Sequence, residues 1–312
     1  MSPLRADGTR EYSESSIATY KECPLQFFYK YETGLEKIEE EANEHHLVYG
    51  KAMHEALKRI YLKDTLESAI KSFKESYPIQ LDTEDNAKTI PHGIQVLKDY
   101  VSHWSEQDKK WKVIEVEQVA SFAYQESGFT VVLDLVMENI EYGGIYGWDH
   151  KVVGGKKATL GFDFWNQFEP NSQVTKYYSF IESKYGACSG FFINAIGMGY
   201  RSRAYKGEPA GTWHRFQRQM FNRNKSQLEL EQRDTRYWIE RIEEDRKHGY
   251  WAMNTGACRW CSYRPVCSAG WTWPEDRELI EIQYKVNPQV APQVSEQKGS
   301  TLNEHSTGVL SE

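Results

Sequence analysis

The sequence places two aspartates and a lysine in neighbouring segments that are rich in strand-forming residues. Asp134 lies in VVLDLVM, and Asp149 and Lys151 lie in IYGWDHKVV. Because side chains alternate along a strand, Asp149 and Lys151 should point to the same side. Two carboxylates can hold Mg²⁺ or Mn²⁺, and a nearby ammonium can orient an attacking water. The alternative is an ion pair at a solvated sheet edge, because aspartate-x-lysine alone is a weak motif.

Three further residues could support such a site. His54 lies in YGKAMHEALKRIY, a helical segment that can project an imidazole toward the sheet. A lone helix histidine is more often a surface or core residue than a ligand. Gln173 and Tyr177 are four residues apart, so they share one helix face. By itself this pair carries no functional meaning.

The five cysteines form a second candidate site. Cys258, Cys261 and Cys267 lie in the turn-rich segment CRWCSYRPVC, and Cys23 lies far upstream before a proline. An odd number of cysteines, with no apolar export signal at the start, argues against a disulfide framework. Cysteines can also pack as small apolar residues. Three within ten residues favour a four-thiolate metal site, although chemistry alone does not divide zinc from iron–sulfur. Cys188, in an apolar run, is expected in the core.

A basic and aromatic segment at 201–225 is the third candidate. It holds seven lysines or arginines and one glutamate, in a chain whose net charge is -7. Basic side chains that neutralise phosphates, interleaved with aromatic stacking platforms, are typical of single-strand binding. The alternative is a solvated basic face with core aromatics. The candidate DNA contacts are Arg201, Arg203, Arg215, Arg218 and Trp213.

Composition limits the classes of protein that fit. With 312 residues, 39% of them hydrophobic and 27% charged, the chain can bury a large core without disulfides. The negative net charge excludes a histone-like coat of nucleic acid. No apolar run is long enough to span a membrane, and no secretory h-region is visible, so we expect a cytoplasmic protein.

The periodicity predicts helices first and then a sheet. A capped helix is expected at 13–28, interrupted near Pro24, and a polar, mostly acidic connector at 36–46. Further apolar stripes predict helices after Gly50, at 66–76 and at 92–104. Three β-rich runs, 113–124, 129–136 and 145–153, predict an antiparallel meander. The rest should contain a helix at 171–184, strands at 188–197 and 212–217, and a helix at 224–247. We expect one domain over 1–285 and a disordered polar tail over 286–312.

The motifs occur in an order that resembles a known family. The series is S-S-I-x-x-Y-x-x-C-P, G-x-x-x-H-E-x-L, V-L-D-L-V, W-D-H-K, Q-x-x-x-Y and C-x2-C-x5-C. It resembles the RecB-like branch of the PD-(D/E)xK nuclease superfamily, over about Ser13 to Cys267. The likeness is greater to members with a four-cysteine iron–sulfur cluster, namely the AddB C-terminal nuclease and the CRISPR-adaptation exonuclease family.

This resemblance implies an α/β fold with a restriction-endonuclease-like core, a central mixed sheet flanked by helices. It also implies a [4Fe–4S] cluster that joins the N- and C-terminal segments, with zinc as the alternative. The implied cluster ligands are Cys23, Cys258, Cys261 and Cys267.

The resemblance also assigns roles in the first candidate site. Asp134, Asp149 and His54 match metal-binding positions, and Lys151 matches the catalytic lysine. Gln173 and Tyr177 match the pair that supports the active site and the DNA. His150 stands where the family usually has an apolar or aromatic residue. Its side chain should point away from its neighbours, while its backbone carbonyl can still serve the metal.

The expected function is therefore metal-dependent DNA hydrolysis with Mg²⁺ or Mn²⁺, by an exonuclease more than an endonuclease, in repair, recombination or replication. The substrate would be single-stranded or end-containing DNA. The chain lacks a G-x-x-x-x-G-K-[ST] motif, so unwinding would need a helicase or another recombination protein as partner. The alternatives are a nuclease-fold DNA-binding subunit with little cleavage and, third, a zinc-stabilised structural protein.

Overall fold

The computed structural model describes residues 10–38, 41–79, 82, 87–124 and 127–287. The chain divides into two compact units. We call residues 40–238 the sheet unit, and residues 1–39 together with 239–312 the cysteine unit. Of the predicted tail, Val286 and Asn287 are described, and Val286 ends a short strand; 288–312 lie outside the described residues. Within the described residues, no helix is both long and apolar enough to cross a membrane.

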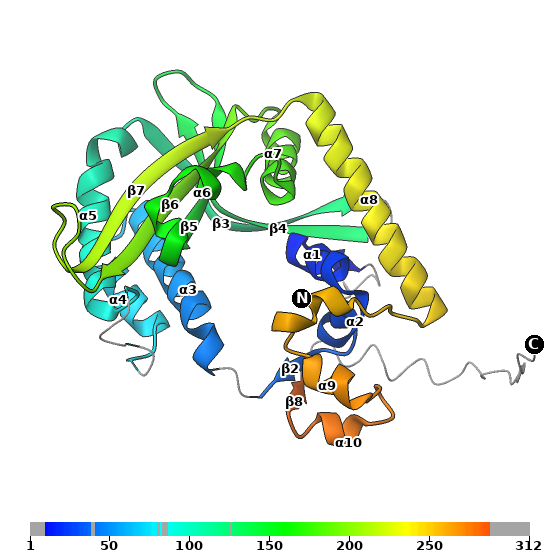
Figure 1. Ribbon diagram of the computed structural model, residues 1–312. Helices are drawn as coiled ribbons and strands as arrows, with labels where there is room; N and C mark the ends of the chain where they lie inside the picture. Colours follow the sequence, from blue (N-terminus) through cyan, green and yellow to red (C-terminus); the bar gives the residue numbers. More distant parts are fainter. Residues whose placement is uncertain (1–9, 39–40, 80–81, 83–86, 125–126, 288–312) are drawn as a thin grey trace, which may run out of the picture. The chain divides into compact units, whose positions relative to one another are not determined.

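The sheet unit is built on a mixed sheet (Figure 1). Its strands lie in the order β3–β4–β5–β6–β7. Their bounds are Trp111–Tyr124, Ser127–Asn139, Ile145–Val153, Gly190–Arg201 and Gly211–Phe221. β3, β4 and β5 pair antiparallel, which confirms the predicted meander. β5 and β6 pair parallel, and β7 returns antiparallel along β6. The α/β class and the mixed sheet are thus as expected.

Three helices pack on one face of this sheet. They are α3 (Glu41–Tyr61), α4 (Leu66–Ser76) and α5 (Ile90–Asp108). Their apolar stripes bury a core that includes Trp148 of β5. The predicted acidic connector at 36–46 is wrong in part, because α3 already begins at Glu41 and β2 occupies Leu35–Lys37. The polar composition of this first turn hid the start of the helix.

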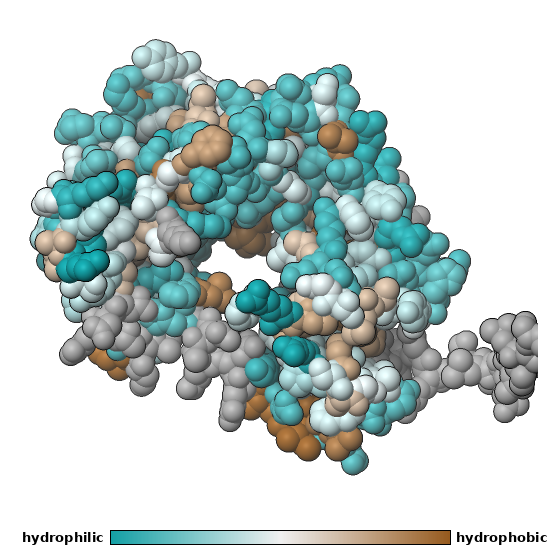
Figure 2. Space-filling model, in the orientation of Figure 1, coloured by the Kyte–Doolittle hydropathy of each residue, from teal (hydrophilic) through white to brown (hydrophobic). Residues whose placement is uncertain are grey.

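The opposite face is covered by a second set of elements. They are η3 (Gly155–Thr159), α6 (Phe162–Asn166) and α7 (Ser172–Tyr185). α7 approaches β5 so closely that a Cβ at Gly147 would lie 2.3 Å from Ile181 Cδ1. Odd-numbered side chains of β5 therefore face α7, and even-numbered ones face α3 and α5. In the view of Figure 2 the surface of this unit is mainly hydrophilic.

The cysteine unit is assembled from the two ends of the chain. α1 (Glu14–Glu22) is capped by Ser13 and separated from α2 (Pro24–Phe27) by Cys23, so the predicted interruption is confirmed. A short π-helix, η1 (Phe28–Glu32), follows. The C-terminal part contains η4 (Thr255–Trp260), α9 (Arg264–Ala269), α10 (Arg277–Ile280) and β8 (Tyr284–Val286). β2 pairs antiparallel with β8, which joins the two ends. The boundary between the units falls within α8 (Lys225–His248).

Candidate active site

The two aspartates meet where β4 and β5 stop pairing. The ladder between these strands ends at Leu135 and Trp148, and Asp134 and Asp149 are the next residues on each side. Beyond the ladder, the backbone N–H of His150 donates a hydrogen bond of 2.6 Å to Oδ2 of Asp134. A strand N–H that would otherwise pair with a backbone carbonyl thus holds a carboxylate in place.

Lys151 lies on the same side of β5 as Asp149, as the alternation predicts. Its Nζ lies 2.8 Å from Oδ2 of Asp149. The Asp149 side chain is 8% exposed and the Lys151 side chain 30% exposed. The lysine therefore connects a buried carboxylate to solvent, where a substrate phosphate could reach its ammonium group.

His54 reaches the same point from α3. Its Nδ1 lies 3.3 Å from Oδ1 of Asp134. Three elements, α3, β4 and β5, thus bring an imidazole and two carboxylates together. The structure therefore places four of the predicted residues at one site: His54, Asp134, Asp149 and Lys151.

The charged groups at this site shift one another's pKa. Burial alone would raise the pKa of Asp134, but the hydrogen bonds from His54 and from the N–H of His150 lower it to about 2. Burial raises the pKa of Asp149, opposed by Lys151 and reinforced by the nearby charge of Asp134. Burial acts to lower the pKa of His54, but the hydrogen bond and charge of Asp134 raise it. Buried negative charge of this kind attracts a cation.

The donor set fits a divalent cation such as Mg²⁺ or Mn²⁺. Hard cations bind carboxylate oxygens at about 2.1 Å, so two neighbouring ligands in an octahedron lie about 3 Å apart. The 3.3 Å between His54 Nδ1 and Asp134 Oδ1 is close to that spacing. Within the described residues, no three His, Cys, Asp or Glu side chains are grouped closely enough to hold a metal ion together. Asp134 and His54 are thus the pair whose spacing fits, and Asp149 adds a second carboxylate beside them.

Gln173 and Tyr177 share one face of α7, as their spacing predicts. Nε2 of Gln173 donates a hydrogen bond of 2.9 Å to the Tyr177 hydroxyl. The Tyr177 ring packs on Phe191 of β6, whose strand partner is Gly147 of β5. Tyr177 thus lies over the face of the sheet that carries Asp149 and Lys151.

His150 differs from the other residues of this segment. Its ring points to the opposite face, as expected, and is 3% exposed. Nδ1 lies 2.8 Å from Nδ2 of Asn194, so this nitrogen is already engaged. The His150 ring is therefore no ligand of this site; only its backbone carbonyl remains available for that expectation.

The four predicted cluster cysteines line one small pocket in the cysteine unit. Cys23 lies between α1 and α2, Cys258 in η4, Cys261 at the end of η4 and Cys267 in α9. Burial, together with the charges of the other three thiols, raises the pKa of Cys267 to about 11. Mutual repulsion of this kind favours a bound cation. Cys188, by contrast, is buried in the sheet unit, where its thiol donates to the Gly190 carbonyl.

The predicted DNA contacts separate into two groups. Trp213 lies between two guanidinium groups, with Arg201 4.8 Å and Arg215 5.6 Å from its ring centroid. Trp213 and Arg215 occupy alternate positions of β7 opposite Gly199 and Gly197, on the sheet face of Asp149 and Lys151. Arg203 is exposed in the turn that follows β6.

The structure contradicts the expectation that Arg218 contacts DNA. Its side chain is 6% exposed and forms an ion pair with Asp108. It lies on the even-numbered face of β7, together with Phe216, against α5. A buried guanidinium with its partners already in place does not reach a phosphate.

Sequence reasoning missed the residues around Arg218. Tyr61, Tyr100, Asp108 and Asn194 all contact it directly. The available signal was the alternation of β7, which places Arg218 on the same face as the apolar Phe216. An arginine on an apolar face requires buried partners, and that requirement would have pointed to this cluster.

A family model and two solved structures are similar to this chain. A family model for the PD-(D/E)XK nuclease superfamily matches residues 11–268. Among solved structures, the chain is similar to a protein of Eubacterium rectale named "Putative exonuclease", with 13% sequence identity and a TM-score of 0.49; the match covers 83% of this chain and 88% of that one. A match to the protein SSO0001 has 11% identity and a TM-score of 0.31, and covers 84% and 87% of the two chains. No curated protein matches the chain in sequence.

Proposed function

The chain belongs to the PD-(D/E)XK nuclease superfamily, and from this premise we propose that it is a metal-dependent deoxyribonuclease, an exonuclease more than an endonuclease, that acts in DNA repair, recombination or replication. One observation carries the proposal. His54, Asp134, Asp149 and Lys151 come from three separate elements and meet at the point where β4 and β5 separate. The side chains that would hold the metal ion and the lysine that would act on the water therefore lie at one site.

The residues divide into three roles in this reaction: metal binding, action on the water and the phosphoryl oxygens, and positioning of the DNA. Asp134, Asp149 and His54 would hold Mg²⁺ or Mn²⁺, which when bound would neutralise charge on the phosphate and help to activate the attacking water. Lys151, held by Asp149, orients that water and stabilises the negative charge that develops on the phosphoryl oxygens. Water adds to phosphorus as the P–O bond to the leaving nucleotide breaks; the water loses a proton to solvent, the leaving oxygen takes one up, and the products are a phosphomonoester end and a hydroxyl end. Gln173 and Tyr177 on α7 would position the DNA strand against this face.

A cleavage assay separates this function from its alternative. Labelled single- and double-stranded DNA, blocked at either end in turn, would be incubated with Mg²⁺ or Mn²⁺ and with EDTA. An exonuclease shortens DNA from the free end and stops at the block, whereas an endonuclease ignores the block. A nuclease-fold binding subunit would bind the DNA without shortening it, which would overturn the proposal of an enzyme.

Trp213 and the two guanidinium groups over its ring, those of Arg201 and Arg215, are proposed as a DNA contact outside the metal site. Arg201, Trp213 and Arg215 lie on the sheet face of Lys151, and exposed Arg203 adds positive charge nearby. Arginines would neutralise phosphates, and the indole offers a surface for a base. Single-stranded or end-containing DNA is therefore the proposed substrate, and a helicase or another recombination protein is the proposed partner.

We expect Arg215→Ala to weaken binding of single-stranded DNA and to flatten its salt dependence. Each lost phosphate contact reduces the slope of log affinity against log salt by about 0.7. Binding would be measured by fluorescence anisotropy over a range of salt concentrations. Arg236→Ala, an exposed arginine of α8, is the control and should leave the slope unchanged. Equal slopes for Arg215→Ala and the wild type would remove this segment from the DNA-binding surface.

A four-cysteine cluster is the third part of the proposal. Cys23, Cys258, Cys261 and Cys267 line one pocket, and the first comes from the opposite end of the chain to the other three. We propose that they hold a [4Fe–4S] cluster, with zinc as the alternative. The hydrolytic groups lie in the sheet unit and require no electron, so the role of the cluster would be structural.

A further inference from the structure

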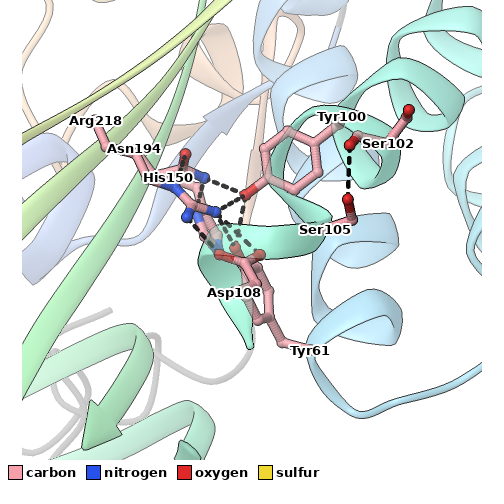
Figure 3. A network of polar contacts seen from close by, with 8 residues as sticks. All are labelled: Tyr61, Tyr100, Ser102, Ser105, Asp108, His150, Asn194 and Arg218. Carbon is pink, nitrogen blue, oxygen red and sulfur yellow. Dashed lines mark hydrogen bonds and ion pairs between the residues drawn. The ribbon is translucent and has the colours of Figure 1, made fainter. Parts of the chain in front are cut away.

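A buried polar network lies on the face of the sheet opposite Asp149 and Lys151 (Figure 3). At its centre is Arg218 of β7, whose guanidinium forms a two-pronged ion pair with Asp108 at the end of α5. The same guanidinium lies 3.8 Å from the ring centroid of Trp104. Burying an arginine is costly unless every donor is satisfied, so this cluster is built to hold one geometry.

Two tyrosines bring α3 and α5 into the network. Nη2 of Arg218 donates to the hydroxyl of Tyr61 at 2.9 Å and to that of Tyr100 at 3.2 Å. The two hydroxyls lie 2.7 Å from each other. Tyr61 belongs to α3 and follows His54 by seven residues, about two helical turns.

Asn194 of β6 connects the network to β5 by hydrogen bonds. Nε of Arg218 donates to Oδ1 of Asn194 at 3.2 Å, and arginine has only donors, so the amide orientation is set. Nδ2 of Asn194 then donates to the Tyr100 hydroxyl at 2.7 Å and to Nδ1 of His150 at 2.8 Å. His150 accepts at Nδ1 and therefore carries its proton on Nε2.

His150 connects this network to the metal site through its own backbone. It stands between Asp149 and Lys151, and its N–H holds the Asp134 carboxylate. Its ring stacks on Tyr61, with centroids 5.4 Å apart and an interplanar angle of 15°. The His54 and His150 rings are also in T-shaped contact, with their centroids 5.9 Å apart and an interplanar angle of 78°. A shift of the His150 ring would therefore displace both the backbone N–H that binds Asp134 and the ring contact with His54.

We propose that Arg218 is a positioning residue for metal binding, and that it acts through Asn194 and His150 on β5 and through Tyr61 on α3. The inference rests on the proposed function, because it concerns the same metal site. It assigns to the neutral His150 ring a role of alignment in place of ligation. A network that served only the fold would affect the melting temperature but not the metal affinity of the folded protein.

The test compares Mn²⁺ affinity among folded variants in the absence of DNA. Asn194→Leu removes the link between Arg218 and His150, and Tyr61→Phe removes one hydroxyl. Tyr77→Phe is the matched control, because Tyr77 is buried in the same core and its hydroxyl donates to the Lys88 carbonyl. Electron paramagnetic resonance of free Mn²⁺ would give the dissociation constants, and thermal melts would give the loss of stability.

We expect the Mn²⁺ dissociation constant to rise about tenfold in Asn194→Leu and severalfold in Tyr61→Phe, and to stay within twofold in Tyr77→Phe. The ¹⁵N resonance of His150 Nδ1 should lose its acceptor signature in Asn194→Leu. Wild-type affinity in both folded variants would overturn the inference. If Asn194→Leu does not fold, Tyr61→Phe against Tyr77→Phe decides the question.

The failure of the proposed function looks different. A wild-type protein that binds Mn²⁺ but cuts no DNA would refute the nuclease, while the variant affinities would still test the positioning role. A wild-type protein that binds no Mn²⁺ would refute the metal site itself, and the inference with it.

Discussion

Lys151→Ala should lower the rate of DNA cleavage by about a thousandfold while the protein still folds and still binds DNA. Groups that stabilise developing charge or position a nucleophile typically contribute factors of about 10² to 10⁴. The Lys151 ammonium lies 2.8 Å from Asp149 and is partly exposed, so its removal leaves no cavity in the core. Single-turnover cleavage of an end-labelled strand at saturating Mn²⁺ would measure the loss.

Lys112→Ala is the matched control for this change. Lys112 is also a strand lysine paired with a carboxylate, 3.1 Å from Glu138, but it lies on β3 and is exposed. Its loss should cost little, because surface ion pairs contribute about 0 to 1 kcal/mol to stability. Cleavage by Lys151→Ala at a rate near that of Lys112→Ala would contradict the active-site assignment.

Asp149→Asn tests the carboxylate at the same site. The substitution keeps the shape and removes a charge whose burial, together with Asp134, raises the pKa of this group. We expect cleavage to be lost and the melting temperature to change little, because the amide no longer carries a buried charge beside Asp134 and water can solvate the partly exposed Lys151 ammonium. The combination of intact folding and weakened Mn²⁺ binding separates a ligand from a packing residue.

The parts of the site that lie on one element were predictable from the sequence. Alternation along β5 placed Asp149 and Lys151 on one side and the His150 ring on the other, and helical spacing placed Gln173 beside Tyr177. These relations depend only on the local period of the backbone. The meander was predictable for the same reason.

The burial of Arg218 was not predictable from the local period of the backbone. Its partners come from α3, α5 and β6, and nothing in the local composition of 201–225 distinguishes it from Arg215. A charged residue is buried or exposed according to what packs against it, which is a property of the tertiary fold. The start of α3 was missed for a related reason, since its polar first turn has no apolar stripe.

Cys23→Ser should remove the metal of the cysteine unit and lower the melting temperature together. Cys23 lies 235 residues before Cys258, so a shared site closes a very long loop. Closing such a loop costs on the order of 5 kcal/mol of chain entropy, and a bound cluster supplies part of the free energy that offsets it. Iron and sulfide analysis, visible absorption and a thermal melt of anaerobically purified protein would measure the effect.

The loss of stability in Cys23→Ser is limited by other contacts between the same two ends of the chain. Arg246 forms a two-pronged ion pair with Glu32, and the hydroxyl of Tyr263 donates to the Leu35 carbonyl at 2.6 Å. These contacts need no metal, so they should keep part of the cysteine unit folded. We therefore expect the melting temperature to fall by on the order of 5 °C, which corresponds to about 3 kcal/mol for a chain of this size.

Cys188→Ser provides the control, because Cys188 is buried in the sheet unit and does not line the pocket formed by the other four cysteines. It should leave the iron content unchanged, whereas Cys23→Ser should abolish it and bleach the brown colour of the protein. Colourless wild-type protein with one zinc per chain would keep the four-cysteine site and reject the iron. A metal-free Cys23→Ser protein that melts and cuts DNA like the wild type would show that these four thiols hold no structural metal, because the loop would then be closed by Arg246, Tyr263 and their partners alone.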